Sequence, residues 1–153
     1  MTTPARPRAV IAGGSLSGLF AATTLRAVGW DVAVFERSAD ALDSRGGGIV
    51  LQPDVLAAFR FAGVRHTDAL GVRSDDRIYL NEADGVILRS YMPQTQTSWN
   101  MLYGAMRSAL PADCIHAGER LVSFKQSGDR VTALFASGRM ERSDLLIGAD
   151  GAG

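Results

Sequence analysis

The sequence predicts an α/β fold built around a parallel β-sheet, and three observations favour it. A short apolar segment at residues 8–12 runs into a turn of small residues between Gly13 and Gly18. An amphipathic segment at 17–28 follows the turn and predicts a helix. A second apolar strand at 31–35 then ends at the acidic Glu36. Strand, glycine turn, helix, strand and acid in this order predict a Rossmann-like βαβ unit that binds a dinucleotide.

The small residues of the turn have separate predicted roles. Glycine at position 13 permits a tight turn, and Gly18 lets the helix pack closely against the strand. Ser15 stands where the usual G-x-G-x-x-G pattern has its middle glycine, and its hydroxyl can donate to a phosphate or cap the helix. The N–H groups of the first helical turn favour a pyrophosphate, and Glu36 is placed to accept a hydrogen bond from a ribose hydroxyl. The alternative is a glycine turn that binds nothing.

The middle of the chain is predicted to contain further short strands and helices. The predicted elements are a loop at 38–48, an apolar strand at 49–51, a helix at 53–62, a strand–turn–strand at 77–91 and a helix at 99–110.

The C-terminal part of the chain is rich in predicted strands. Four short strands are expected at 114–116, 121–126, 130–136 and 139–142, and together they predict a small meander appended to the main sheet. The last apolar strand, within 145–151, runs into a turn at Asp150 and Gly151. A parallel sheet usually continues into a crossover helix after such a strand, so the chain is expected to be part of a longer protein.

Composition narrows the class of protein. The chain has 153 residues, which suffice for one domain with a core, and its hydrophobic content of 46% argues against disorder. A formal net charge of zero gives no electrostatic case for binding nucleic acid or an anionic membrane, and no apolar run is long enough to span a bilayer. The single cysteine, Cys114, is typical of a reducing compartment, so a cytoplasmic location is expected. His66 and His116 lack partners at ligand spacing, so no metal site is expected.

The order of motifs resembles that of the FAD-dependent aromatic hydroxylases, the group of the 4-hydroxybenzoate and phenol hydroxylases. The motifs are Gly13–Gly18, Phe35–Arg37, Gly46–Pro53 and Leu146–Gly151. The resemblance extends over nearly the whole chain and covers the N-terminal part of such enzymes. It implies a Rossmann-like FAD-binding domain of the GR2 type with an appended β-meander. On this interpretation residues 1–153 form one partial FAD-binding domain, without the substrate domain and the later motifs.

The resemblance also implies which residues would hold FAD. They are Gly13, Gly14, Ser15, Leu16, Ser17 and Gly18 at the pyrophosphate, Glu36 and Arg37 at the adenosine, Arg45 and Gly48 near the flavin, Leu121 at the adenine, and Asp150 and Gly151 in a second fingerprint that serves FAD and the reduced nicotinamide. In many members of the family, an arginine or glutamine at the start of the helix before the meander reaches the pyrophosphate, and this chain has Trp99 there. Core packing is the expected role of Trp99, Tyr91 and Tyr103, and stacking on a ligand ring is the alternative.

The activity implied by the resemblance is hydroxylation of an aromatic or N-heteroaromatic ring by an FAD-dependent monooxygenase. Such an enzyme uses NAD(P)H and O2 together with a small aromatic substrate, and a homodimer is one expected assembly. No catalytic residue is predicted. One alternative is a catalytically inert dinucleotide-binding fragment or interaction module. Another is half of an NAD-binding dehydrogenase, against which the β-rich block argues, because such a half would continue as alternating strands and helices.

Overall fold

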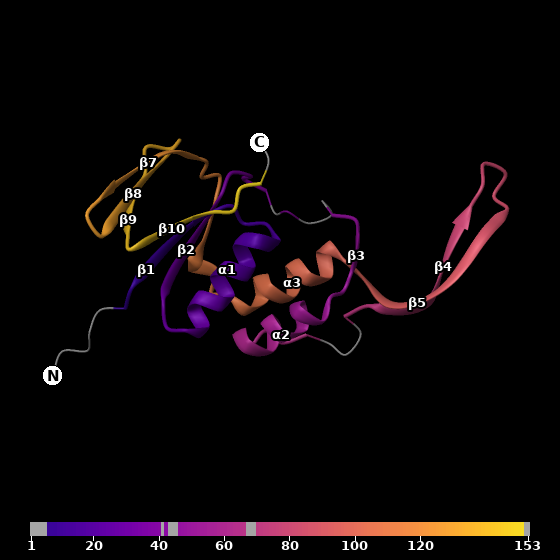
Figure 1. Ribbon diagram of the computed structural model, residues 1–153. Helices are drawn as coiled ribbons and strands as arrows, with labels where there is room; N and C mark the ends of the chain where they lie inside the picture. The colour runs from indigo at the N-terminus through magenta and orange to yellow at the C-terminus, as the bar shows by residue number, and fades with distance from the viewer. Residues whose placement is uncertain (1–5, 41, 43–45, 67–69, 152–153) are drawn as a thin grey trace.

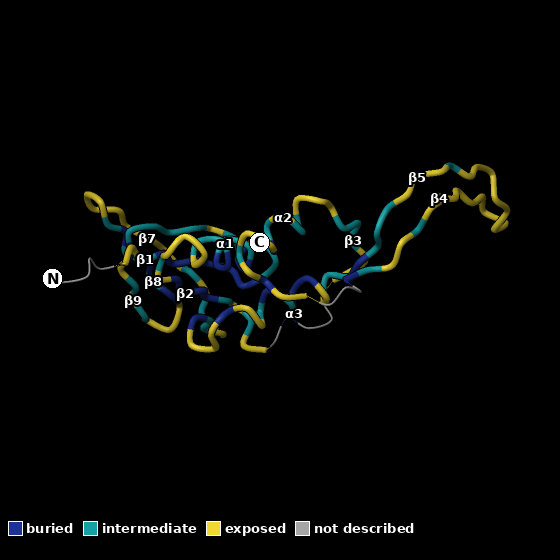
Figure 2. The backbone as a smooth tube through the Cα atoms, turned by 90° about the horizontal axis from the view of Figure 1, so that it is seen from below, coloured by how far each residue is buried: buried dark blue, intermediate teal, exposed yellow. Residues whose placement is uncertain are grey.

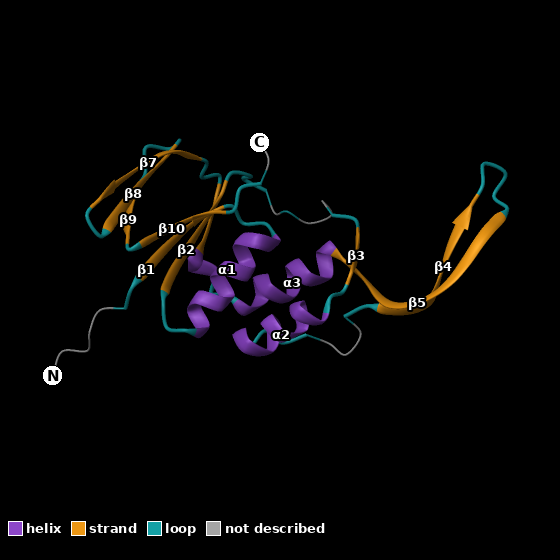
Figure 3. Ribbon diagram, viewed as in Figure 1, coloured by secondary structure: helices purple, strands orange, loops and turns teal. Residues whose placement is uncertain are grey.

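The computed structural model describes residues 6–40, 42, 46–66 and 70–151 and shows three layers with a projecting arm (Figure 1). A parallel sheet forms the middle layer, helices cover one of its faces, and an antiparallel meander covers the other (Figure 3). A long β-hairpin extends away from these layers. The α/β fold with a Rossmann-like sheet and a meander is therefore confirmed.

The parallel sheet has four strands in the order β10-β1-β2-β6. They are β1 (Arg8–Ala12), β2 (Asp31–Glu36), β6 (Ile115–Ala117) and β10 (Leu145–Gly148). Ala12 lies opposite Phe35 on one side and opposite Gly148 on the other, so three strands end at the same edge of the sheet. Ligands of open α/β sheets bind at this carboxyl edge.

The helical layer consists of α1 (Leu16–Ala27), α2 (Pro53–Ala62) and α3 (Trp99–Ala109). These bounds lie within one residue of the predicted helices. Strand residues alternate between the two faces of the sheet because successive side chains of a strand point in opposite directions. Ala9, Ile11, Val32 and Val34 pack in the helix-side core.

The opposite face of the sheet packs against the meander. Val10, Ala33 and Phe35 form a second buried cluster with Ala133 and Phe135 of the meander. Both faces of the middle strands are therefore covered, which explains why these strands are continuously apolar rather than alternating.

The meander consists of β7 (Leu121–Ser127), β8 (Arg130–Phe135) and β9 (Met140–Ser143), paired in that order. The prediction that residues 114–116 belong to this meander is wrong. Those residues contribute instead to the 3-10 helix η1 (Ala112–Cys114) and to β6, which pairs in parallel with β2. The physical reason is that α3 crosses over the sheet before β6, and such a crossover returns the chain to a parallel neighbour.

The projecting arm is a hairpin of β4 (Val72–Leu80) and β5 (Val86–Ser98), with the short β3 (Gly48–Val50) paired at its base. It is longer than the predicted strand–turn–strand at 77–91, and most of its residues are exposed (Figure 2). Tyr91 is 71% exposed, so its expected packing in the core is wrong. None of the helices within the described ranges combines the length and the apolar character needed to cross a membrane.

Candidate functional site

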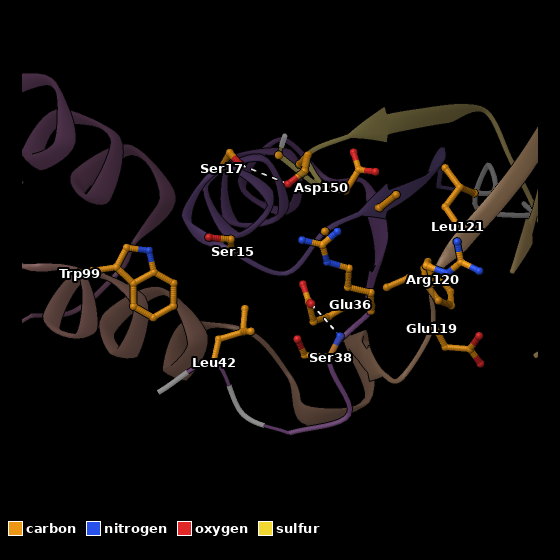
Figure 4. Close-up of a pocket in the computed structure, with 16 residues that line it drawn as sticks. Ser15, Ser17, Glu36, Ser38, Leu42, Trp99, Glu119, Arg120, Leu121 and Asp150 are labelled. Carbon is orange, nitrogen blue, oxygen red and sulfur yellow. Dashed lines mark hydrogen bonds between the residues drawn. The ribbon is translucent and has the colours of Figure 1, made fainter. Parts of the chain in front are cut away.

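A cavity of about 520 Å³ opens at the carboxyl edge of the parallel sheet. Its walls come from the β1–α1 turn, the end of β2, the start of α3, the segment before β7 and the residues after β10 (Figure 4). Segments distant in sequence therefore meet where the fold class places ligands.

The glycine turn contains two close backbone approaches that only glycine permits. Gly13 has φ = 111°, a region that side chains other than glycine rarely adopt, and a Cβ there would overlap the carbonyl of Ala149. Its N–H donates to the Phe35 carbonyl at 2.7 Å, so the turn passes between the ends of β2 and β10. A Cβ on Gly18 would overlap the Gly13 carbonyl. The predicted needs for a tight turn at Gly13 and for close packing at Gly18 are both confirmed.

Helix α1 points its N-terminus at the cavity. Helix geometry leaves the N–H groups of Leu16, Ser17 and Gly18 without an intrahelical acceptor, and the first turn contains no acidic residue. Ser15 is the N-cap residue, yet its side chain makes no capping hydrogen bond. Of its two predicted roles, helix capping is therefore wrong, and donation to a phosphate stays a prediction. Ser17 is exposed and its hydroxyl lies 3.5 Å from the Ala149 carbonyl.

Glu36 ties the end of β2 to the glycine turn. Its Oε2 accepts a hydrogen bond from the Gly14 N–H at 2.7 Å, and its Oε1 accepts one from the Ser38 N–H at 2.8 Å. The fingerprint did not predict this structural role. A carboxylate has about four lone-pair sites, so Glu36 can accept a ribose hydroxyl in addition.

Gly14 supports the turn from outside the cavity. A Cβ on Gly14 would lie 3.0 Å from the Cβ of Glu36, which would press on the carboxylate that the Gly14 N–H holds. Gly14 is buried and is not among the residues that line the cavity.

The wall beside Glu36 is formed by the segment that precedes β7. The Glu119 N–H donates to the Glu36 carbonyl at 2.8 Å, and the Gly118 N–H donates to the Ser38 carbonyl at 3.0 Å. These bonds bring Glu119, together with Arg120 and Leu121, to the cavity.

The sequence motifs do not predict Glu119 and Arg120 as site residues. No pattern in the sequence marks them, because the sequence predicts the preceding short strand as part of the meander, and only the fold places that strand in the parallel sheet. Arg37 and Arg120 are both exposed at the cavity, and no carboxylate among the described residues pairs with either guanidinium. Two cationic groups thus remain available to an anionic or aromatic ligand.

The structure brings most of the predicted site residues together. Those that line the cavity are Gly13, Ser15, Ser17, Glu36, Arg37, Leu121, Asp150 and Gly151. Gly14, Leu16, Gly18 and Gly48 do not line it, and Arg45 lies outside the described residues. Gly48 instead pairs with Ser98 at the base of the arm.

Trp99 also lines the cavity, and its ring stacks on Tyr103 with centroids 4.6 Å apart. Tyr103 is only 9% exposed, so its expected core packing is confirmed. Trp99 is partly buried and packs against the same core while it faces the cavity, which core packing alone did not predict. In the described ranges, no group of three or more His, Cys, Asp or Glu side chains could hold a metal ion.

Comparison with known proteins identifies a family for almost the entire chain. A family model described as "FAD binding domain" matches residues 7–153. The glycine turn Gly13–Ser15 and the segment Gly48–Pro53 had predicted a resemblance to 2,6-dihydroxypyridine 3-monooxygenase within the aromatic hydroxylases. A protein of that name from Paenarthrobacter nicotinovorans is 33% identical over 150 residues, which are 97% of this chain and 38% of the relative.

Two further matches agree. Chloroplastic zeaxanthin epoxidase of Oryza sativa subsp. japonica is 32% identical over 95% of this chain and 25% of its own length. The solved structure of 2,6-dihydroxypyridine-3-hydroxylase from Arthrobacter nicotinovorans matches with a TM-score of 0.85 and 32% identity, over 97% of this chain and 38% of that chain. The chain thus spans well under half the length of these relatives.

Proposed function

The chain belongs to the FAD-binding domain family, and on this premise we propose that it holds FAD across the cavity as the N-terminal part of a monooxygenase. The single observation that supports this most strongly is the cradle at the β1–α1 turn. Gly13 and Gly18 permit a turn so tight that a Cβ at either position would overlap a backbone carbonyl, and the N-terminus of α1 faces the cavity without a competing acid. A diphosphate fits this arrangement because backbone N–H groups and the helix dipole both favour anions.

Each part of the proposed FAD contact follows from the position of its residues. The backbone N–H groups of the first turn of α1 and the hydroxyls of Ser15 and Ser17 would hold the diphosphate. The carboxylate of Glu36 would accept the ribose hydroxyls, and Arg37 and Leu121 would contact the adenine. This division leaves the cavity beyond Ser15 for the rest of the cofactor.

Asp150 and Gly151 close the cavity next to the first turn of α1. We propose, as the resemblance implies, that they serve both FAD and the reduced nicotinamide, because an exposed carboxylate accepts hydrogen bonds from hydroxyl groups. Arg45 and Gly48 remain proposed contacts near the flavin, on the resemblance alone.

FAD, when bound, supplies the redox and oxygen chemistry, and the residues of this chain bind and orient it and exclude water from its diphosphate. We propose an aromatic or N-heteroaromatic ring as substrate, with NAD(P)H and O2 as co-substrates of the whole protein. This is supported by the relative named 2,6-dihydroxypyridine 3-monooxygenase, of which the chain spans 38%.

The test is to saturate the purified chain with FAD, remove free FAD by gel filtration and record the visible absorption spectrum. We expect flavin bands close to one FAD per chain, and we expect excess ADP to release part of the flavin because both ligands share the diphosphate cradle. A colourless protein whose melting temperature does not respond to FAD would support the alternative, an inert fragment.

Three narrower expectations stay predictions. They are a homodimer, a cytoplasmic location and the assignment of residues 1–153 to one partial FAD-binding domain. Analytical ultracentrifugation of the chain tests the first, fractionation of cells tests the second, and cooperative unfolding in a single transition tests the third.

A further inference from the structure

The backbone of Trp99 is fixed where β3, β5 and α3 meet. Its N–H donates to the Gly47 carbonyl at 3.1 Å, and the neighbouring Ser98 pairs with Gly48. The Ser98 hydroxyl caps α3 by accepting a hydrogen bond from the Met101 N–H at 3.2 Å. Trp99 is therefore held at the first turn of α3 by contacts on both sides.

The side chain of Trp99 is also confined. Its indole stacks on Tyr103 at an interplanar angle of 14°, and Tyr103 belongs to the helix-side core. Gly46 lies so close to the Trp99 side chain that a Cβ on Gly46 would overlap it. A ring held between a buried aromatic side chain and a glycine loses little further conformational entropy when a ligand arrives.

Trp99 stands at one end of the cavity. Figure 4 shows its indole beyond Ser15, on the side away from Glu119, Arg120 and Leu121. A ligand whose adenosine lies at Leu121 and whose diphosphate lies at Ser15 would extend towards Trp99. The indole N–H is a hydrogen-bond donor, and no group among the described residues accepts from it.

We propose that Trp99 is a positioning residue for FAD, which contacts the cofactor on the far side of its diphosphate. This inference rests on the proposed function. The indole N–H donates to a ribityl oxygen, and the flat ring limits the path of the ribityl chain. The contact is uncharged, so its strength depends little on salt, unlike that of an arginine in the same place.

Titration calorimetry with FAD and with ADP tests this inference, because only FAD extends past Ser15. We expect Trp99→Ala to weaken FAD binding by about tenfold and to change ADP binding by less than about twofold, the scale of one lost hydrogen bond plus ring contact. Trp99→Phe keeps a ring and removes the N–H, so it should weaken FAD binding by about threefold. Trp30→Phe is the matched control, because Trp30 is partly buried in the same core and does not line the cavity.

The outcomes separate the two proposals. A wild-type chain that binds neither ligand contradicts the proposed function itself. If the wild type binds FAD and Trp99→Ala binds it equally well, or loses FAD and ADP affinity to the same extent, the inference about Trp99 is overturned while the function stands. If Trp99→Ala does not fold, Trp99→Phe decides, and an unchanged affinity for FAD overturns the N–H contact.

Discussion

Glu36 combines two tasks at the scale of a single residue. Its carboxylate accepts hydrogen bonds from the N–H groups of Gly14 and Ser38, and the proposed ligand would add a ribose hydroxyl. We expect Glu36→Ala to weaken FAD binding by about 1–3 kcal/mol, and to lower the free energy of unfolding without ligand by a similar amount because two N–H groups lose their acceptor. Titration calorimetry and urea unfolding measure the two effects.

Two further variants serve as controls. Glu36→Gln retains one acceptor oxygen and should lie between wild type and Glu36→Ala in both measurements. Glu82→Ala removes an exposed acid at the tip of the arm and should change neither. If Glu36→Ala binds FAD as tightly as the wild type, Glu36 does not contact the ligand.

Gly13 and Gly29 offer a matched pair of glycines with positive φ. Gly13 has φ = 111° and the Ala149 carbonyl in the way of a Cβ, whereas Gly29 has φ = 92° and no atom within 4 Å. Gly29→Ala should therefore lower the free energy of unfolding by about 1–2 kcal/mol through backbone strain alone, and Gly13→Ala should lower it by clearly more. Urea unfolding of both variants decides. Equal losses would show that the approach of Ala149 is not tight.

Spacing along the sequence predicted those site residues whose positions are fixed within one βαβ unit. Gly13 and Glu36 were found because one βαβ unit fixes the distance between the turn and the second strand. Glu119 and Arg120 were not, because they reach the cavity through backbone bonds to Glu36 and Ser38, and no local pattern encodes that pairing.

At the scale of elements, His116 of β6 contacts β2 and the turn that precedes β9. Its ring stacks on Phe35 with centroids 4.7 Å apart, and its Nδ1 lies 3.3 Å from Nη1 of Arg139. Burial, and next the charge of Arg139, lower the pKa of His116 below its ordinary value of 6.5. The unfolded chain therefore takes up a proton before the folded chain does as the pH falls.

His116 should therefore contribute fully to the free energy of unfolding above pH 6.5. This contribution should be lost as the pH falls through the lower pKa that His116 has in the folded chain. Urea unfolding between about pH 7.5 and about pH 5.5 measures this loss, and His116→Phe, which keeps a ring on Phe35, should reduce it.

The protonation of Glu141 does not interfere with the comparison between the wild type and His116→Phe. Burial raises the pKa of Glu141, but hydrogen bonds from Arg8 and Arg139 outweigh it and hold that pKa below 4.5. Its contribution therefore changes only at lower pH. A pH dependence as steep in His116→Phe as in the wild type would contradict the assignment to His116.

The arm of β4 and β5 should be separable from the layers. Asp76 pairs with Tyr91, so an Asn-Gly turn joining these two residues would remove the outer part of the hairpin and leave its base intact. Because the removed residues 77–90 are mostly exposed, we expect the free energy of unfolding to change by less than about 1 kcal/mol and FAD affinity to stay the same. Loss of FAD affinity in this variant would place part of the site on the arm.

The helices were predicted almost to the residue, whereas the membership of β6 was not. Pro53 and Gly63 mark the two ends of α2 in the sequence itself. A three-residue strand such as Ile115–Ala117 has no pattern that selects its partner, and only the crossover formed by α3 indicates a parallel one. The length of the arm was underestimated because β4 and β5 lack a buried face that would produce apolar alternation.

At the scale of the whole molecule, two hydrophobic cores fix the carboxyl edge of the parallel sheet. The helix-side cluster and the meander-side cluster fix β1 and β2 from both faces, and the turn that leaves β1 is thereby presented to the cavity. The alternation of Ala9, Val10 and Ile11 between these clusters follows from strand geometry, but which layer covers which face depends on distant segments.

The central claim is that the β1–α1 turn holds the diphosphate of FAD, and a crystal structure of the chain grown with FAD tests it most directly. The account predicts electron density for the diphosphate at the N–H groups of Leu16, Ser17 and Gly18, with a ribose hydroxyl on Glu36. A cofactor bound elsewhere, or a turn that is closed to it in crystals of a chain that retains FAD in solution, would contradict the account.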